Sequence, residues 1–346
     1  MKLAALLLPL FLAAPAPEGK RLPVHVGGRF VTDGEALRFG WPGVYIEGRF
    51  KGTSVVVEYS TDTDFLRVSV DGKATQGRTQ PGYTEVRIDG LSPGIHTVRL
   101  EKLTESQSGS TRFEGFFTRG QPLPPPDPKP QIEFIGDSHS VGYGDLSPTR
   151  ECDGAKVHDT TDTSQAFGPV LARRLGADYR VIAYSGYGVV RNYAGRKPGE
   201  SLPFLYPRAI PGEATPAAPD PAWQPRVIVI NLGTNDFSTP VHAGEAWADA
   251  AALHADYRAR YIDFVKELRR RQPQARLVLM GAENFYPDVA AVAAATGATP
   301  VKIGTLEMTA CNHHPSLSDQ RTMADLLDPL VRPAVTPPSA PRRSRR

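Results

Sequence analysis

Six prolines fall within ten residues at 121–130, and the spacing of apolar residues differs on the two sides of this segment. Proline fixes φ and lacks a backbone donor, so a run this dense favours a stiff, extended spacer. Before it, apolar and polar residues alternate in short runs, whereas after it compact apolar runs alternate with helical stretches. The sequence therefore predicts two domains, at 22–119 and 131–332, joined by a linker at 120–130.

The first domain is predicted to contain only β-strands. Its runs have a period of two residues and are separated by glycine turns, including an Asp-Gly pair at 71–72 that is typical of a hairpin. Closely spaced strands without helical segments between them are typical of a β-sandwich or jelly roll. The expected strands are Val44–Phe50, Ser54–Ser60, Phe65–Val70, Tyr83–Ile88, His96–Leu103 and Arg112–Thr118.

The second domain is predicted to be α/β. Its apolar runs are compact and rich in β-branched residues, as in the buried strands of a parallel sheet. Alternation of such strands with helical stretches indicates a parallel sheet that is covered by helices. The expected strands are Gln131–Ile135, Tyr179–Ala183, Arg226–Leu232 and Arg276–Met280, and the expected helices are Ser164–Leu175 and Ala246–Arg271.

The two ends of the chain differ from the domains. Residues 1–16 combine a lysine, a short apolar run and a small-x-small sequence, the pattern of a secretory signal peptide. The run is too short to span a bilayer and no cysteine follows it, so we expect a secreted or periplasmic protein without a membrane anchor. Residues 333–346 are proline-rich and then basic, which predicts a disordered tail.

The net charge of +3 does not indicate a nucleic-acid partner, because the excess comes from the ends of the chain. Without Lys2 and the four arginines among residues 342–346, the chain has 35 basic and 37 acidic residues. The folded body is therefore nearly neutral, and its composition gives no reason to expect a polyanion.

A candidate nucleophile follows the first buried strand of the second domain. Residues 132–138 read Ile-Glu-Phe-Ile-Gly-Asp-Ser, so Ser138 comes directly after a strand. In open α/β sheets, ligands bind beyond the carboxyl ends of the strands. The elbow motif of the α/β-hydrolases is not present, since Ser140 stands where it has its second glycine. By itself, a Gly-Asp-Ser segment is more commonly explained by a turn serine that caps the next helix.

Three further segments extend the pattern. They are Tyr184-Ser-Gly-Tyr-Gly188, Asn231-Leu-Gly-Thr-Asn-Asp236 and His313-His-Pro315. With Gly-Asp-Ser138, they resemble in order and residue type the four blocks of the SGNH (GDSL-type) hydrolases. The N-terminal jelly roll and the Cys-x-x-His-Pro-Ser segment make the chain more closely similar to carbohydrate esterase family 2. This resemblance implies a three-layer α/β/α domain with a parallel sheet, preceded by a jelly-roll β-sandwich.

The resemblance also implies an activity, that of a secreted serine esterase which removes O-acetyl groups from plant cell-wall polysaccharides such as xylan and glucomannan. Ser138 would be the nucleophile and His314, which precedes a proline as in the family pattern, the base. The N–H groups of Ser138 and Gly186 and the side-chain amide of Asn235 would bind the oxyanion. The alternatives are a carbohydrate-binding protein with an impaired site, an esterase for another acyl group, and an acyltransferase.

The sequence departs from the common family pattern at the third member of the catalytic triad. An aspartate usually lies two or three residues before the base, where this chain has Asn312 and Cys311. Some members of the family resemble this chain in lacking the acid and relying on a dyad. Asn312 is the candidate to orient the imidazole through its amide oxygen. Asp137 and Asp236 are interpreted as structural residues of the two loops.

Further contacts follow from the implied fold. The residues that are candidates to line the substrate cleft are Tyr187, Arg191 and His313. For Tyr187 and Arg191, the alternative is a structural role in packing or in an ion pair. For His313, the alternative is a solvent-facing position in a loop. Composition alone leaves the pairing of Cys152 and Cys311 open, but the implied fold places both loops at the catalytic edge and predicts a disulfide. The sequence has no Walker lysine, His-Glu-x-x-His or Cys-x-x-Cys motif, so we expect no cofactor and no metal. We also expect the protein to be a monomer.

Overall fold

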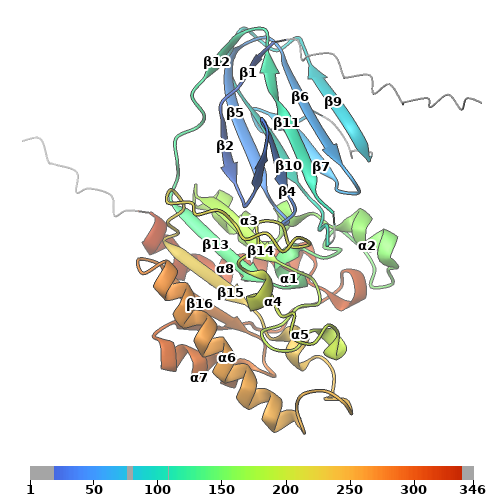
Figure 1. Cartoon of the computed structure of the whole chain (residues 1–346), viewed down its shortest axis with the longest axis vertical. Helices are drawn as coiled ribbons and strands as arrows, with labels where there is room; N and C mark the ends of the chain where they lie inside the picture. Colours follow the sequence, from blue (N-terminus) through green and yellow to red (C-terminus); the bar gives the residue numbers. More distant parts are fainter. Residues whose placement is uncertain (1–18, 76–80, 108, 337–346) are drawn as a thin grey trace, which may run out of the picture.

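The computed structural model describes residues 19–75, 81–107 and 109–336, which form two domains stacked along the long axis of the molecule (Figure 1). A β-sandwich comes first along the chain and an α/β domain second, so the predicted fold class is confirmed. The signal peptide expected at 1–16 lies outside the described residues, as does most of the expected tail.

The sandwich consists of two antiparallel sheets. In its described part, one sheet has the order β3-β4-β11-β6-β9 with β1 beside β11, and the other has the order β12-β5-β10-β7-β8 with β2 beside β5. Because successive side chains of a strand point to opposite faces, Ile46, Val57 and Phe116 are fully buried in the core. The strands are β1 (Lys20–Arg21), β2 (Val24–Gly27), β3 (Val31–Asp33), β4 (Ala36–Phe39), β5 (Tyr45–Gly52), β6 (Val55–Thr61), β7 (Leu66–Val70), β8 (Lys73–Ala74), β9 (Gly82–Ile88), β10 (Gly94–Lys102), β11 (Thr111–Thr118) and β12 (Gln121–Leu123).

The predicted strands of this domain correspond to β5, β6, β7, β9, β10 and β11. The strands that the sequence did not predict include β1, β2, β3, β4 and β8. Each of these has at most four residues, which is too short for a clear alternating pattern. β12 lies inside the predicted linker and pairs with β5 at an edge of the sheet. An edge strand tolerates Pro122, which has no backbone N–H to donate, because such a strand has a neighbour on one side only. The sandwich therefore extends to Leu123.

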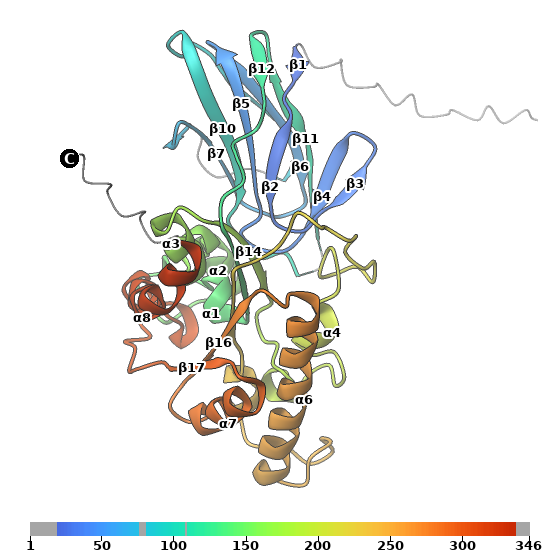
Figure 2. The same cartoon turned by 90° about the vertical axis from the view of Figure 1, so that its left-hand side faces the viewer.

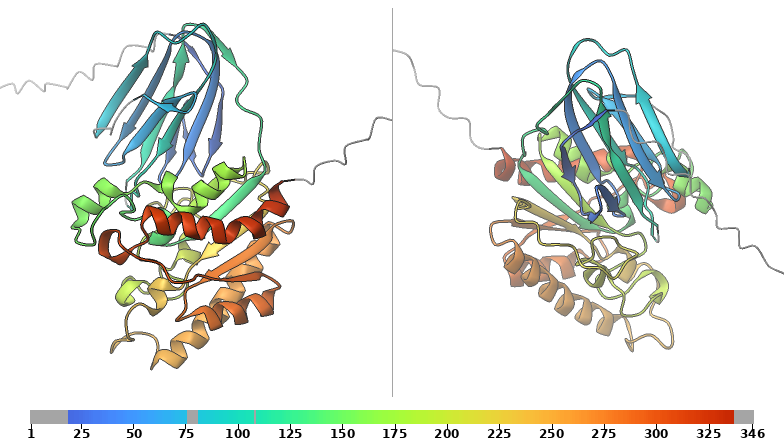
Figure 3. Two further views of the ribbon diagram at one scale, coloured as in Figure 1. Left: turned by 180° about the vertical axis from the view of Figure 1, so that it is seen from behind. Right: turned by 45° about the horizontal axis from the view of Figure 1, so that its top comes forward.

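In the α/β domain, a parallel sheet with the order β14-β13-β15-β16-β17 lies between two layers of helices. Helices α3 and α8 cover one face, and α6 and α7 cover the other (Figures 2 and 3). The strands are β13 (Gln131–Gly136), β14 (Asp178–Ala183), β15 (Val227–Asn231), β16 (Arg276–Gly281) and β17 (Thr299–Lys302). The helices are α1 (Ser138–Val141), α2 (Gly154–Thr160), α3 (Phe167–Arg174), α4 (Leu202–Leu205), α5 (Thr234–Phe237), α6 (Ala250–Arg271), α7 (Tyr286–Thr296) and α8 (Leu317–Val335), with 3-10 helices η1 (Thr163–Gln165), η2 (Tyr193–Gly195) and η3 (Cys311–His313).

Strand β13 is buried on both faces. Phe134 belongs to the core under α3 and α8 and packs edge-on against Phe167, with ring centroids 6.0 Å apart. Its neighbour Ile135 belongs to the core on the other face, under α6 and α7. A strand that is covered on both sides gains from apolar residues at every position, which is why it reads as a continuous apolar run.

Helix α8 continues past the boundary at 332, where the sequence predicted that the tail begins. It passes through Pro329 and Pro333 and ends at Val335, although each proline removes a helical hydrogen bond. Val331 and Val335 are buried in the core of the α/β domain, and the burial of these apolar side chains offsets that loss. Residues 333–335 therefore belong to the α/β domain.

Polar contacts join the sandwich to the α/β domain. Arg29 of the sandwich lies 3.3 Å from the carboxylate of Glu133 on β13, and Glu133 is only 1% exposed. The hydroxyl of Tyr45 donates a hydrogen bond of 2.8 Å to the carboxylate of Asp178, at the start of β14. Glu133 also accepts from the Tyr206 hydroxyl and the Trp223 indole N–H within its own domain, so Arg29 adds the charged partner that comes from the sandwich.

Candidate active site

Ser138 is the first residue of α1 and follows β13 directly. The carboxylate of Asp137 caps this helix by accepting a hydrogen bond of 3.0 Å from the His139 N–H. The turn requires glycine at position 136, because a Cβ there would lie 2.0 Å from the Oγ of Ser140. β13 lies between β14 and β15, where the strand order reverses. Ser138 therefore stands at the topological switch point, beyond the carboxyl ends of the strands.

The imidazole of His314 lies beside this serine, although the two residues are 176 positions apart in the chain. Its Nε2 atom is 2.9 Å from the Oγ of Ser138. Its Nδ1 atom is 2.9 Å from the main-chain carbonyl oxygen of Cys311 and 3.2 Å from that of Asn312. A carbonyl only accepts hydrogen bonds, so Nδ1 carries the ring proton and Nε2 can accept the proton of Ser138.

The prediction that the side chain of Asn312 orients the base is wrong. Its amide nitrogen lies 3.4 Å from the hydroxyl of Tyr143 instead. The main chain reaches the imidazole because Asn312 and His313 form a tight turn with φ values of 50° and 58°. A serine and a histidine therefore form a dyad in which main-chain carbonyls take the place of the acid.

Replacing Asn312 with glycine should leave kcat for 4-nitrophenyl acetate within about threefold of the wild-type value. Glycine adopts a φ of 50° without strain and keeps the carbonyl that accepts from His314. The measurement is steady-state hydrolysis of this ester by both proteins. A fall in kcat of more than about tenfold would show that the amide side chain, and not the main chain, orients the base.

The surroundings of His314 favour its neutral form. Burial, together with the nearby ring of His139, lowers the pKa of His314 to about 4, while the two carbonyl acceptors raise it. The ring of His139 lies edge-on to His314 at 5.6 Å, and burial lowers the pKa of His139 to about 4 as well. An uncharged carbonyl on Nδ1 stabilises the imidazolium less than a carboxylate does. The imidazole of His314 therefore stays neutral into acidic solution.

This pKa predicts an unusual pH dependence. The base must be neutral to accept a proton, so activity falls as pH drops through the pKa of His314, near 4 instead of the ordinary 6.5. We expect 4-nitrophenyl acetate hydrolysis to lose its last activity in an acid limb near pH 4, below any step from Asp137 and Asp236, whose pKa values burial raises to about 7 and about 6. The measurement is a kcat/KM profile at constant ionic strength, and complete loss of activity already at about pH 5.5 would contradict the prediction.

Candidate oxyanion donors lie at the ends of β13 and of its two neighbours in the sheet. Gly186 follows β14 with a φ of 85°, and Asn235 lies in α5 after β15. In the part of the chain that the structure describes, the N–H groups of Ser138 and Gly186 have no acceptor within the protein. The amide nitrogen of Asn235 donates to the Tyr187 carbonyl at 2.9 Å and lies 3.4 Å from the carboxylate of Asp137, which holds the side chain in place.

Asp137 and Asp236 are buried carboxyl groups with structural partners. Asp236 accepts hydrogen bonds of 2.9 Å from the N–H groups of residues 189–191, so it shapes the loop that follows β14. Burial raises the pKa of Asp137 to about 7 and that of Asp236 to about 6, against the effect of their backbone donors. Among the contacts of the described residues, neither carboxylate forms a hydrogen bond with the imidazole of His314.

Two of the three candidate cleft residues are buried. The predicted role of Arg191 is wrong, whereas that of Tyr187, which is about as exposed as Ser138, stays a prediction. Arg191 is 1% exposed, because its guanidinium binds Glu245 at 2.8 Å and main-chain carbonyls of the same loop region. Tyr187 is 6% exposed and packs edge-on against Tyr184, with ring centroids 4.3 Å apart. His313 is exposed, and its place in a cleft stays a prediction.

Sequence reasoning missed three aromatic side chains of this region. Tyr143 stacks on His314, with ring centroids 4.2 Å apart and an interplanar angle of 30°. His139 lies edge-on to the same ring. Tyr193 is 46% exposed, and its N–H donates to the carbonyl of Gly186 at 2.8 Å. The only signal in the sequence is that each follows a motif residue by a few positions.

The structure contains the predicted disulfide between Cys152 and Cys311. It joins two loops that are 159 residues apart in sequence, and the Cα atoms lie 5.4 Å from each other. Closing a loop of this length contributes a few kcal/mol in the chain-entropy model, although measured gains are often smaller. The bond fixes Cys311, whose carbonyl accepts from the imidazole of His314.

The arrangement suits acyl transfer without a cofactor, since it brings together a candidate nucleophile, a candidate base and candidate oxyanion donors. Among the described residues, no cluster of His, Cys, Asp or Glu could hold a metal ion, and no helix is long and apolar enough to cross a membrane. A dyad of this geometry at the switch point of a five-stranded parallel sheet defines a serine hydrolase of the SGNH (GDSL-type) class. Family models agree, since residues 26–126 match the carbohydrate esterase 2 N-terminal domain and residues 134–309 match the GDSL-like lipase/acylhydrolase family.

Known proteins narrow the class further. The chain is 42% identical over 342 residues to an acetylxylan esterase / glucomannan deacetylase of Cellvibrio japonicus, with 94% of each chain covered. A solved carbohydrate esterase, whose active site is described as displaying divergent catalytic and non-catalytic binding functions, is 39% identical with a TM-score of 0.81, covering 90% of this chain and 97% of that one. A family two carbohydrate esterase from Clostridium thermocellum in complex with cellohexaose is 27% identical with a TM-score of 0.78, covering 89% and 98%. The chain therefore belongs to carbohydrate esterase family 2 and is a carboxylic ester hydrolase.

Proposed function

We propose that this enzyme is exported and removes O-acetyl groups from plant cell-wall polysaccharides of the xylan or glucomannan type. The observation that carries the proposal is the 2.9 Å contact between the Oγ of Ser138 and the Nε2 of His314. The Cellvibrio japonicus relative, whose name gives acetylxylan and glucomannan as its substrates, supports the substrate class. The signal-peptide pattern at 1–16 supports export.

The first half of the reaction forms an acyl-enzyme. His314 takes the proton of the Ser138 hydroxyl on Nε2 while the serine oxygen attacks the acetyl carbonyl carbon. The resulting oxyanion is bound by the N–H groups of Ser138 and Gly186 and by the amide of Asn235. The bond to the sugar oxygen then breaks, and the imidazolium returns its proton to that oxygen. The polysaccharide leaves with a free hydroxyl.

The second half releases acetate. A water molecule gives a proton to Nε2 of His314 and attacks the acetyl carbonyl of the acyl-enzyme. The same donors bind the second oxyanion, and the imidazolium then protonates the departing Oγ of Ser138. Throughout, the Cys311 and Asn312 carbonyls hold the Nδ1 proton, which keeps the ring in the tautomer that the reaction needs.

An exposed aromatic ring supports a sugar substrate. Tyr193 is 46% exposed and is fixed next to Gly186 by the hydrogen bond from its own N–H. A sugar ring can lie on an exposed aromatic face of this kind. The intact contact between Ser138 and His314 favours an esterase over a carbohydrate-binding protein with an impaired site. The proposed enzyme acts as a monomer, since one chain supplies all of these groups.

The test is acetate release from acetylated xylan and acetylated glucomannan by the purified mature chain. We expect the wild type to release acetate from both polymers and the Ser138→Ala variant to release none above background. Equal release by the two proteins would overturn the mechanism. Appearance of acetylated sugar acceptors without free acetate would show an acyltransferase, and faster hydrolysis of butyrate than of acetate esters would show another acyl specificity.

A further inference from the structure

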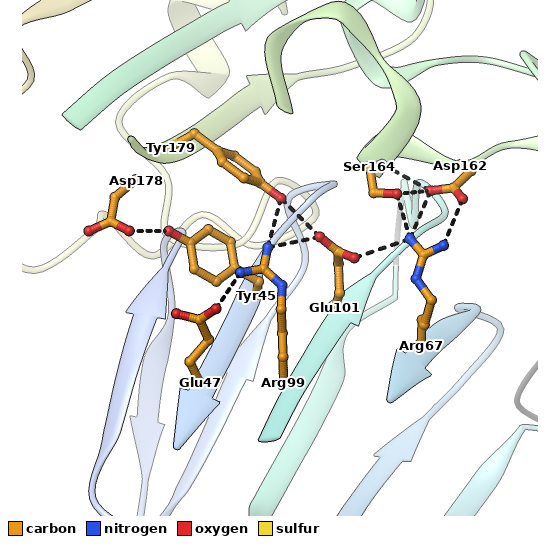
Figure 4. A network of polar contacts seen from close by, with 9 residues as sticks. All are labelled: Tyr45, Glu47, Arg67, Arg99, Glu101, Asp162, Ser164, Asp178 and Tyr179. Atoms are coloured by element: carbon orange, nitrogen blue, oxygen red, sulfur yellow. Dashed lines mark hydrogen bonds and ion pairs between the residues drawn. The ribbon is translucent and has the colours of Figure 1, made fainter. Parts of the chain in front are cut away.

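A continuous network of charged and polar groups crosses the boundary between the domains (Figure 4). Arg99 of the sandwich binds Glu101 at 2.8 Å and the hydroxyl of Tyr179 at 3.1 Å, and Glu101 also binds Arg67 at 3.1 Å. Although burial raises the pKa of Glu101, the two arginines lower it to about 2, so the group stays charged. The network is therefore held by charge at neutral pH. Its members are Tyr45, Glu47, Arg67, Arg99, Glu101, Asp162, Ser164, Asp178 and Tyr179.

One end of this network differs from the rest because it reaches the loops of the candidate active site. Arg67 lies on β7, and its guanidinium binds both carboxylate oxygens of Asp162, at 3.2 and 3.4 Å. Asp162 is 6% exposed and caps η1 by accepting from the Ser164 N–H at 3.0 Å. The main chain reinforces the contact, since the Thr163 N–H donates to the Leu103 carbonyl of the sandwich at 2.8 Å. The sandwich thus fixes the turn that precedes α3.

The turn at 161–165 also holds the loop that follows α1, the helix that begins with Ser138. The Asp162 N–H donates to the carboxylate of Asp145 at 3.0 Å. The hydroxyl of Thr161 accepts from the Gly144 N–H at 2.9 Å. Both bonds end on residues directly after Tyr143, so the position of Tyr143 depends on residues 161–162.

Tyr143 and Gly144 contact the base and its support. The ring of Tyr143 stacks on His314 at 4.2 Å. Gly144 packs so closely on the disulfide that a Cβ there would lie 2.4 Å from the Cβ of Cys311. The loop therefore touches the imidazole on one side and, on the other, the residue whose carbonyl binds its Nδ1 atom.

The geometry points to Arg67 as a positioning residue for the base, one that acts from the sandwich domain through Asp162 and the Tyr143 loop on His314. This inference rests on the proposed function, in which His314 is the base. Loss of the guanidinium leaves a buried carboxylate with less compensation, and the turn at 161–165 relaxes. A displaced Tyr143 no longer holds the ring of His314 in line with the hydroxyl of Ser138, which slows proton transfer without weakening the binding of a small ester.

A matched pair of variants tests this inference in the full-length mature chain. Arg67→Met removes the contact, and Arg38→Met removes an interdomain ion pair that leads elsewhere, since Arg38 binds Glu213 at 2.7 and 3.1 Å. The two arginine side chains are similarly exposed, at 27% and 30%. We expect Arg67→Met to lower kcat for 4-nitrophenyl acetate about tenfold with KM within about twofold, and Arg38→Met to leave both within about twofold. Equal kcat values for the two variants would overturn the inference.

A double-mutant cycle separates positioning from a general loss of stability. If Arg67 acts through Tyr143, the effects of Arg67→Met and Tyr143→Leu on kcat are not additive, and the double variant is as slow as Tyr143→Leu alone. Full multiplication of the two effects would contradict the proposed path. Should Arg67→Met fail to fold, Asp162→Asn replaces it in the same cycle, because asparagine keeps the cap of η1 but loses the charge that Arg67 binds.

The same measurements distinguish this inference from the proposed function. Wild-type activity in Ser138→Ala would refute the dyad itself. An inactive Ser138→Ala together with an unimpaired Arg67→Met would refute only the role of the sandwich domain. Arg67→Met should have the lower thermal unfolding midpoint, because the side chain of Asp162 is 8% exposed and that of Glu213 is 34% exposed. Measuring kcat well below both midpoints ensures that a difference in kcat reports on the base and not on the folded fraction.

Discussion

Replacing Ser138 with alanine should lower kcat for acetate esters by at least about 10⁴-fold, because no covalent intermediate can form without the hydroxyl. His314→Ala should fall to nearly the same residual rate, since the serine is not activated without the base. The double variant should be no slower than either single variant, because the two groups act as one unit. The measurement is steady-state hydrolysis of 4-nitrophenyl acetate, corrected for the uncatalysed rate.

The chain offers a control for this prediction in Ser140→Ala. Ser140 lies on the same short helix, is 2% exposed, and its hydroxyl has no hydrogen-bond partner among the described residues. Its removal should therefore leave kcat unchanged. A Ser138→Ala variant with more than about one-hundredth of the wild-type kcat would contradict the role of Ser138 as nucleophile.

Replacing Asn235 with alanine should lower kcat by about 10² to 10³-fold with little change in KM, the usual cost of one oxyanion donor. The amide interacts with charge that develops only in the transition state, so binding of the uncharged ester is spared. Asn235 is 6% exposed, and its amide is held by the Tyr187 carbonyl, so the donor is already in place before substrate binds. The measurement is kcat and KM for 4-nitrophenyl acetate, well below the thermal unfolding midpoint.

A second substitution tests the donor itself, and the thermal unfolding midpoint of each variant separates its effect on kcat from a loss of structure. Asn235→Asp keeps the size of the side chain and removes the donor, so its kcat should fall at least as far as that of Asn235→Ala. A fall of less than about tenfold in both variants would show that Asn235 does not bind the oxyanion. Burial raises the pKa of Asp236 to about 6, and an added carboxyl nearby makes the Asn235→Asp loop less stable above that pH.

The parts of the site that lie directly at strand ends could be predicted from the sequence. The position directly after a buried strand indicated Ser138, because parallel strands bring their carboxyl ends to one edge. The resemblance to the SGNH hydrolases indicated Gly186 and Asn235, which follow the two neighbouring strands. The longer strands of the sandwich were predictable for a similar reason, since apolar and polar residues that alternate over several positions are typical of a half-buried strand.

Contacts that depend on the main chain or on distant partners could not be predicted. Every residue has a carbonyl, so the sequence suggested the side chain of Asn312 where the structure uses the main chain. Arg191 was wrongly assigned to the cleft. Its burial depends on Glu245, which lies 54 positions away and gives no local signal in the sequence. The stack of Tyr143 on His314 depends on loop packing, for which no periodic signal exists.

The pairing of Arg29 with Glu133 limits how this chain can be taken apart. Glu133 belongs to the strand that ends at Ser138, but its counter-charge comes from the other domain. In an isolated α/β fragment, Glu133 would lose this cation and keep only the Tyr206 hydroxyl and the Trp223 indole N–H as donors, on a surface that the sandwich no longer covers. Engineers who graft the hydrolase half onto a foreign carrier module would have to redesign Glu133 and Asp178 first. The proline segment therefore connects two domains that cannot be exchanged for others without changes to their contact surfaces.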